Sequence, residues 1–129
     1  MARPDLTPTL TLTTVNIGAP DPIALARFYE QLLGWEIAVE ETHWVLLVQD
    51  HAGGVRLSFQ HEPYHVPPTW PAGPGDQQMM MHLEIRVDDL AAALAHAVDC
   101  GATVAEYQPQ DDVRVCLDPV GHPFCLWLG

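Results

Sequence analysis

The clearest pattern of apolar and polar residues in this chain runs from residue 79 to residue 101. Between positions 79 and 87 apolar and polar residues alternate, which is the period of a half-buried β-strand. One face of this strand carries Leu83, Ile85 and Val87, and the other face carries His82, Glu84 and Arg86. A helix is expected next, with Asp88 as its N-cap and Gly101 at its end, because the following apolar residues recur at helical spacing.

An earlier stretch, residues 14–34, shows the same order of patterns. A β-branched run is followed by Asp21 as a predicted N-cap, an apolar stripe at helical spacing, and Gly34 as a predicted helix end. The separation from Asp21 to Gly34 equals that from Asp88 to Gly101. We therefore interpret the chain as two copies of one unit.

Each unit continues with three more predicted strands. In the first unit, the opening strand at 9–17 and its helix are followed by strands at 35–39, 43–49 and 55–60, with a turn at 50–54. In the second unit the strands are 103–106, 112–117 and 124–128, with a reverse turn at 118–121. The predicted fold is α+β, with two βαβββ modules. We expect them to pair into one curved eight-stranded mixed sheet with a central cleft and the helices on its outer face, because neither half can bury both of its surfaces alone.

A proline-rich stretch, residues 61–77, separates the two modules. Its prolines and glycines exclude a helix or a central strand. A loop of this length in a compact domain is either functional or disordered, and its aromatic residues, Trp70 among them, favour an arm that covers the cleft or a partner subunit over a flexible spacer. The predicted organisation is one structural domain with a flexible tail at 1–8, a first module at 9–60, this arm, and a second module at 78–129.

The composition excludes several classes of partner. The sequence has 17 acidic residues, five arginines and no lysine, which gives a formal charge of −12 and opposes binding to nucleic acid. No apolar run approaches the roughly 20 residues of a membrane helix, and no signal segment opens the chain, so we expect a soluble cytoplasmic protein. The three cysteines lack the spacing of metal-binding or disulfide motifs and are expected to be reduced thiols.

Three segments in order carry a family resemblance: FYEQLLGWE at 28–36, HLEIRVDDL at 82–90 and DPVGHPFCLWL at 118–128. With the duplicated pattern, they resemble the vicinal oxygen chelate superfamily, which includes glyoxalase I, bleomycin-resistance proteins and extradiol dioxygenases, and especially its small glyoxalase-like bacterial proteins. The resemblance covers residues 9–129. It implies the paired-module fold and a cleft that holds a small molecule, and it implies a homodimer, since drug-sequestering members often are.

Metal-using members of this superfamily place one ligand on the first strand and one on the last strand of each module. In this sequence only His82 matches such a position cleanly. The other positions fall on or beside Leu12, Thr14, Asn16, Arg56, Ser58, Gln60 and Cys125. Because a bound divalent ion needs at least three donors, no catalytic metal is expected. The alternative is a nickel, zinc, iron or manganese ion held by His82 with Glu84 or Cys125, in a lyase, isomerase or dioxygenase.

Other side chains near His82 also have two readings. Glu84 can act as a general base if an apolar cleft raises its proton affinity, or it can form an ion pair with Arg86. Cys125 can act as a nucleophile if His82 lies within hydrogen-bond reach, or it can be a buried core thiol. We expect the remaining histidines to be surface residues: His43, His51, His61, His65, His96 and His122.

Tryptophan side chains are candidates for the walls of the cleft. Flat aromatic rings hold planar or cationic ligands by stacking and cation–π attraction. Trp44, Trp70 and Trp127 are assigned this role, with the core as the alternative for Trp44 and Trp127. The leading hypothesis is a metal-independent protein that binds an apolar or aromatic, including cationic, small molecule, with His82, Glu84, Arg56, Ser58, Asn16 and Cys125 around it.

Overall fold

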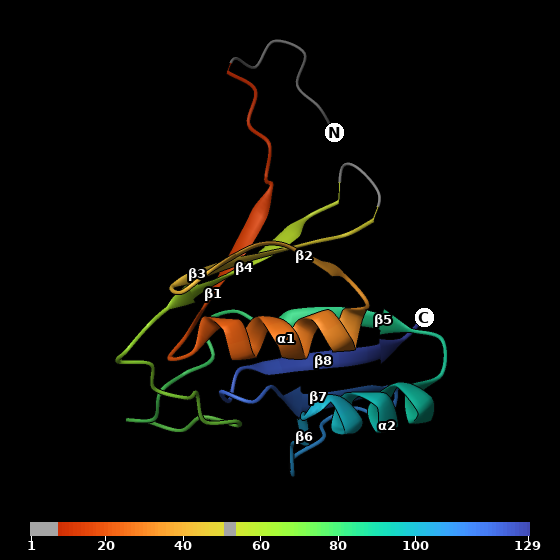
Figure 1. Ribbon diagram of the computed structural model, residues 1–129. Coiled ribbons are helices and arrows are strands. Elements are labelled where there is room, and N and C mark those ends of the chain that lie inside the picture. Colours follow the sequence, from red (N-terminus) through yellow and green to blue (C-terminus); the bar gives the residue numbers. More distant parts are fainter. Residues whose placement is uncertain (1–7, 51–53) are drawn as a thin grey trace.

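The structure, a computed structural model, describes residues 8–50 and 54–129. The elements of the first module are β1 (Thr14–Ala19), α1 (Pro22–Leu33), β2 (Glu36–Glu41), β3 (Trp44–Val48) and β4 (Arg56–His61). Those of the second module are β5 (Leu83–Val87), α2 (Leu90–Cys100), β6 (Thr103–Val104), β7 (Val113–Leu117) and β8 (Pro123–Leu128). Both modules follow the order βαβββ, so the α+β class and the duplication are confirmed (Figure 1).

Each module has its own four-stranded mixed sheet. The strand orders are β1-β4-β3-β2 and β5-β8-β7-β6, in which β1–β4 and β5–β8 are parallel pairs and the other pairs are antiparallel. In the described part of the chain no ladder joins β1 to β5, so two sheets replace the single eight-stranded sheet that was expected. A cavity lined by β1 and by the residues leading into β5 separates the two edges, whereas paired strands must approach to about 4.8 Å.

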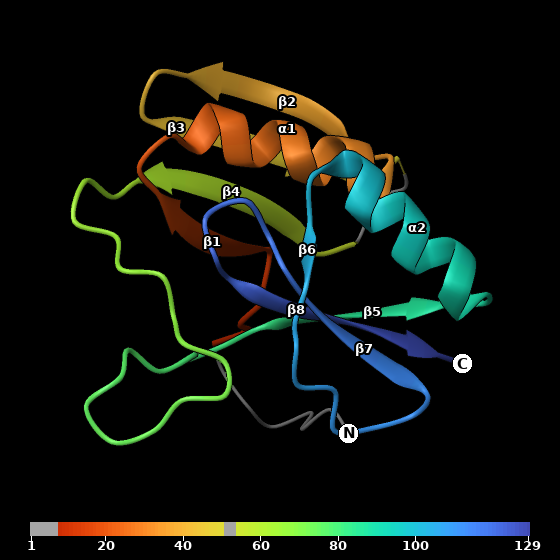
Figure 2. The same ribbon diagram turned by 90° about the horizontal axis from the view of Figure 1, so that it is seen from below.

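Helix α1 packs against both sheets (Figures 1 and 2). The ring of Tyr29 stacks on Phe59 of β4, with 5.6 Å between the ring centroids, and meets Phe124 of β8 edge-on at 6.2 Å. All three side chains are at most 1% exposed and belong to one core that both modules share. The sequence predicts both helices on the outer face, whereas α1 lies where the two modules join.

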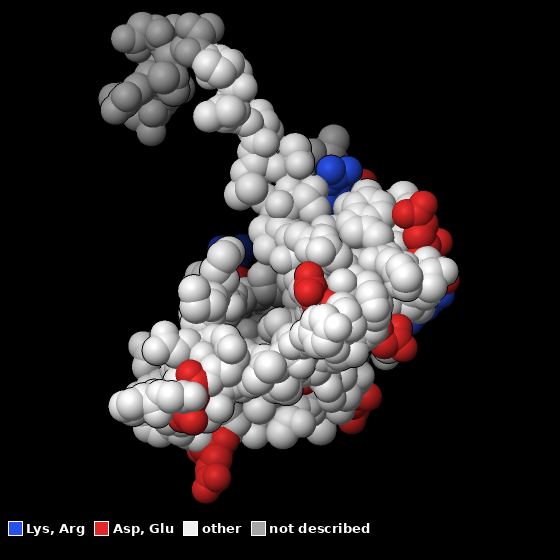
Figure 3. All heavy atoms as spheres, turned by 90° about the vertical axis from the view of Figure 1, so that its left-hand side faces the viewer, with Lys and Arg blue, Asp and Glu red and all other residues white. Residues whose placement is uncertain are grey.

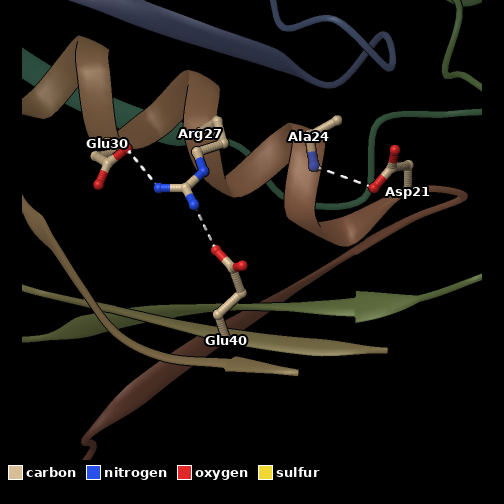
Figure 4. Close-up of polar contacts among 5 residues, drawn as sticks. All are labelled: Asp21, Ala24, Arg27, Glu30 and Glu40. Carbon is tan, nitrogen blue, oxygen red and sulfur yellow. Dashed lines mark hydrogen bonds and ion pairs between the residues drawn. The ribbon is translucent and has the colours of Figure 1, made fainter. Parts of the chain in front are cut away.

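The ends of α1 follow from its sequence. The Asp21 carboxylate accepts a hydrogen bond from the Ala24 backbone N–H at 3.1 Å (Figure 4). Gly34 ends the helix with a φ of 70°, which favours glycine. Arg27 on the solvent side pairs with Glu30 of the same helix at 3.3 Å and with Glu40 of β2 at 2.7 Å. The predicted helix is therefore confirmed at both ends.

Two strands begin at least four residues later than predicted. β1 starts at Thr14 rather than at residue 9, because its partner β4 begins at Arg56, which lies opposite Thr14. Residues 8–13 form an extended segment without strand pairing. β5 starts at Leu83, so residues 79–82 approach the sheet without joining it.

The N-cap of α2 is Asp89, not the predicted Asp88. The Asp89 carboxylate accepts from the Ala92 N–H at 3.0 Å, and the helix ends at Gly101, which has a φ of 119°. Most of the predicted tail at 1–8 and of the turn at 50–54 lies outside the described residues, as does His51. Within the described ranges, neither helix has the length and apolar character that crossing a membrane requires.

Candidate functional site

A cavity of about 390 Å³ lies where the two modules meet the proline-rich arm. One wall is formed by residues 15–18 of β1, and another by the segment 77–83 that leads into β5. The arm adds Val66 and Pro68. Figure 3 shows this side of the molecule as a hollow surrounded mostly by uncharged side chains. The cavity is therefore a meeting point of segments that are far apart in the sequence.

Two histidines at the cavity hold its walls together. His122 in the β7–β8 turn donates from Nε2 to the Gly18 carbonyl oxygen of β1 at 2.8 Å, and His65 of the arm donates from Nε2 to the Val120 carbonyl oxygen at 2.8 Å. Their ring centroids are 4.7 Å apart. Both rings line the cavity and are half-buried, so the expectation that they are surface residues is wrong. In the neutral ring, a donating Nε2 leaves Nδ1 as an acceptor.

A buried hydrogen-bond network positions His122. Asp118, only 4% exposed, accepts from the Tyr29 hydroxyl at 2.7 Å and from the backbone N–H groups of Val120 and His122 at 3.0 Å each. Burial raises the pKa of the Asp118 carboxyl, while the Tyr29 hydrogen bond and the nearby His122 oppose this rise. Burial and the Asp118 charge raise the pKa of the Tyr29 hydroxyl well above its usual value. The predicted turn at 118–121 is confirmed, and its Gly121 has a φ of 91°.

Residues of the first module that the sequence assigned to the site form hydrogen bonds between β1 and β4. The Asn16 side-chain amide donates to the Ser58 hydroxyl at 2.6 Å, and Arg56 donates to the Thr14 hydroxyl at 3.0 Å. Of these residues only Asn16 lines the cavity. Leu12 is 73% exposed and precedes β1. These residues do not offer the histidine or carboxylate ligands of a metal shared by the two modules, so a four-ligand ion between the modules does not fit.

The second module does bring its predicted residues together. His82 Nε2 lies 2.5 Å from a carboxylate oxygen of Glu84, and one nitrogen, oxygen or sulfur atom from each of His82, Glu84 and Cys125 lies within 4.8 Å of the other two. Burial, followed by the negative charge of Glu84 and its hydrogen bond, raises the pKa of the Cys125 thiol to about 12. A thiol held in its protonated form does not suit a nucleophile.

The surroundings of Glu84 match neither alternative considered from the sequence, a general base in an apolar cleft or an ion-pair partner of Arg86. Its side chain is 51% exposed, so it does not lie in the apolar environment that a general base with raised proton affinity needs. Among the described residues its ion-pair partner is His82, not Arg86. Arg86 instead lies opposite Trp127 in the β5–β8 register.

The tryptophans lie away from the cavity. Trp44 is half-buried on β3 opposite Gln60, and Trp127 is half-buried on β8. Trp70 donates from its indole N–H to the Tyr107 carbonyl oxygen at 3.3 Å, so it holds the arm against the second module. The cavity is lined instead by the run Met79–Met81, which sequence reasoning assigned to a strand. Three consecutive flexible apolar residues beside His82 were the signal that could have identified this wall.

Comparison with known proteins agrees with the fold. The sequence profile described as a glyoxalase-like domain matches residues 14–127. A glyoxalase/bleomycin resistance protein/dioxygenase family enzyme from Burkholderia phytofirmans PsJN is 21% identical, with a TM-score of 0.69 over 92% of this chain and 98% of that chain. A search of curated proteins found no match.

Two similar structures have names that refer to antibiotics. The antibiotic-binding protein TnmS3 from Streptomyces sp. CB03234 is 16% identical, with a TM-score of 0.61 over 95% of this chain and 98% of that chain. The bleomycin resistance determinant encoded on the transposon Tn5 is 22% identical, with a TM-score of 0.56 over 91% of this chain and 96% of that chain. At these identities the likenesses establish the fold. Since the family profile spans nearly all of the described residues, the chain belongs to the glyoxalase-like domain family.

Proposed function

We propose that this chain binds an uncharged apolar or aromatic small molecule in the cavity between its modules, with planar antibiotics as the first class to screen. The observation that carries the proposal is the cavity itself. Its volume of about 390 Å³ falls in the range of roughly 300–1,000 Å³ that is typical of small-molecule sites. Its lining is chiefly apolar with a few polar groups. In small-molecule sites the apolar surface usually supplies affinity, and the polar groups fix the orientation of the ligand.

The lining favours an adaptable site. The methionines Met79–Met81 are unbranched and polarisable, and such side chains fit ligands of irregular shape. His65 and His122 can accept hydrogen bonds from a ligand through Nδ1. Among the described residues that line the cavity there is no aspartate or glutamate, so the acidic side chains that give the formal charge of −12 do not line it. A neutral ligand therefore suits the cavity better than the cationic one considered from composition.

The names of similar proteins support the ligand class. TnmS3 is named as an antibiotic-binding protein, and the Tn5 protein as a bleomycin resistance determinant. Binding without chemical conversion is consistent with a cavity that depends on shape and a few hydrogen bonds.

A thermal-shift screen of planar antibiotics and aromatic metabolites, followed by calorimetry on the hits, tests this proposal. Met81→Glu places a carboxylate in the lining and should weaken binding at least tenfold, which corresponds to about 1.4 kcal/mol. Tyr64→Ser is the control, because Tyr64 lies on the arm that borders the cavity, is 91% exposed and does not itself line the cavity. It should leave the affinity unchanged.

Trp127→Ala tests whether the ligand binds in the cavity or against Trp127, which the sequence suggested as a wall of the site. Trp127 does not line the cavity, so this variant should retain binding. A hit whose binding survives Met81→Glu but is lost in Trp127→Ala would overturn the proposed location. A screen in which no compound stabilises the chain would overturn the proposed ligand class.

We also infer that the chain forms a homodimer through its N-terminal segment. Residues 8–13 extend from the molecule without strand pairing, and Leu10 and Leu12 are 86% and 73% exposed (Figure 1). Alternating threonine and leucine favour a strand, and an unpaired strand with exposed apolar residues gains stability by adding to another sheet. Light scattering after size exclusion should show a dimer, and Leu10→Asp with Leu12→Asp should give a monomer. A monomeric wild-type chain would contradict this inference.

A further inference from the structure

Three side chains of the types that ligate metals gather on one face of the second module's sheet. His82 directly precedes β5, Glu84 lies within β5, and Cys125 of β8 is the register partner of Glu84. Their donor atoms lie within 4.8 Å of one another. Nitrogen, oxygen and sulfur ligands at about 2.0–2.3 Å from a tetrahedral zinc ion are roughly 3.3–3.8 Å apart. Side-chain rotation has to bring the more distant donors closer together and to separate His82 Nε2 from the Glu84 oxygen, which lie 2.5 Å apart.

Two of the three side chains are already in contact, because His82 Nε2 lies 2.5 Å from a carboxylate oxygen of Glu84. Cys125 lies beside them as the register partner of Glu84. A divalent ion held between the three would take an imidazole nitrogen, a carboxylate oxygen and a thiolate sulfur, and the thiol proton would be released to solvent when the ion binds.

We propose that His82, Glu84 and Cys125 form a three-donor site for a thiophilic divalent metal ion, with zinc as the matching ion. Imidazole, carboxylate and thiolate are the ligands that zinc takes in proteins, whereas magnesium and calcium take oxygen ligands. All three donors come from one module. This site therefore differs from the four-ligand, two-module arrangement that the family resemblance implies.

The surroundings of the site suit an ion that enters from solvent. The side chains of His82 and Glu84 are 31% and 51% exposed, and all three residues lie on the sheet face opposite the core residues Ile85 and Leu126. Replacing them should therefore leave the core intact. His82 also lines the cavity, so a bound ion lies at its edge.

The test uses the full chain after treatment with a chelator. Titration with Co²⁺, which reports thiolate ligation through a sulfur-to-metal charge-transfer band, should show one ion per chain and this band. Calorimetry with Zn²⁺ should give the same stoichiometry. Cys125→Ser should remove the band and weaken zinc binding by at least on the order of 100-fold, since even outer-shell changes cost 10–100-fold. Cys100→Ser is the matched control, because Cys100 lies on α2, and it should bind as the wild type does.

His82→Ala is a second variant at an exposed position and should weaken zinc binding as strongly. Thermal melting of each chelated variant checks that it folds. Absence of stoichiometric binding to the wild-type chain, or binding that survives both Cys125→Ser and His82→Ala, would overturn the metal site. Small-molecule binding measured in the presence of chelator depends on the cavity alone, so failure of the metal site is distinguishable from failure of the proposed function.

Discussion

Tyr29→Phe removes one oxygen from the hydrogen-bond network that joins the two modules. The Tyr29 hydroxyl on α1 donates to Asp118 in the β7–β8 turn at 2.7 Å, and both residues are nearly fully buried. The phenyl ring of the variant keeps the stacking on Phe59 and the edge contact with Phe124. The substitution therefore changes the hydrogen bond and leaves the packing in place.

The expected loss follows from the partner that remains. Asp118 keeps its two backbone donors, but one oxygen of a buried carboxylate loses its only side-chain donor. A hydrogen bond to a charged group contributes roughly 1.5–3 kcal/mol, so the free energy of unfolding should fall by about 2 kcal/mol. For a domain of this size that corresponds to a decrease in Tm of roughly 8 °C.

The loss should depend on pH with a definite sign. Burial already raises the pKa of Asp118, and the Tyr29 hydrogen bond lowers it, so Tyr29→Phe should raise this pKa further. A carboxyl with a raised pKa in the folded state binds its proton more tightly there than in the unfolded chain. It therefore destabilises the fold above the folded pKa, and this penalty disappears as the pH falls toward the ordinary value of 3.8. The effect of Tyr29→Phe should be largest near neutral pH and should shrink in acid.

Urea denaturation at neutral pH and at several acidic pH values measures this effect. The matched background is Asp118→Asn, which keeps an acceptor for the turn but carries no charge. In that background Tyr29→Phe should cost less and should lose its pH dependence. An unchanged Tm, or a loss of equal size at every pH and in both backgrounds, would refute the role assigned to the Tyr29–Asp118 hydrogen bond.

Two further predictions concern the helix ends and surface. Asp89→Ala should reduce the free energy of unfolding by about 1 kcal/mol because it removes the N-cap of α2, while Asp88→Ala should have almost no effect, as measured by thermal melting. Equal effects of the two would contradict the cap assignment. Arg27→Ala should change stability by less than about 1 kcal/mol, because its ion pairs with Glu30 and Glu40 are partly exposed. A larger loss, unaffected by salt in the melting buffer, would show that Arg27 acts through packing.

Features that depend on near neighbours in the chain were predictable from sequence. Asp21 and Gly34 define the ends of α1 because a cap and a left-handed glycine act on the adjacent turn. His82 and Glu84 share one face because the strand period is two, and this placed two of the three donors of the proposed metal site side by side. The duplicated order of elements was also predictable, because each strand and helix has a periodicity set by near neighbours in the chain. The predicted N-cap of α2 was wrong by one residue, because Asp88 and Asp89 are adjacent and either side chain can cap a helix.

Features that depend on distant segments required the tertiary structure. β1 begins at Thr14 because Arg56, its register partner, is where β4 begins, and propensity alone extended the strand to residue 9. The cavity arises where the arm, β1 and Met79–Met81 meet, so His65 and His122 became lining residues through contacts that no sequence period encodes. Sequence periodicity determined which side chains share a strand or helix face, because that geometry repeats within a few residues. The tertiary structure decided which faces enclose the cavity, because that depends on packing between segments widely separated in the chain.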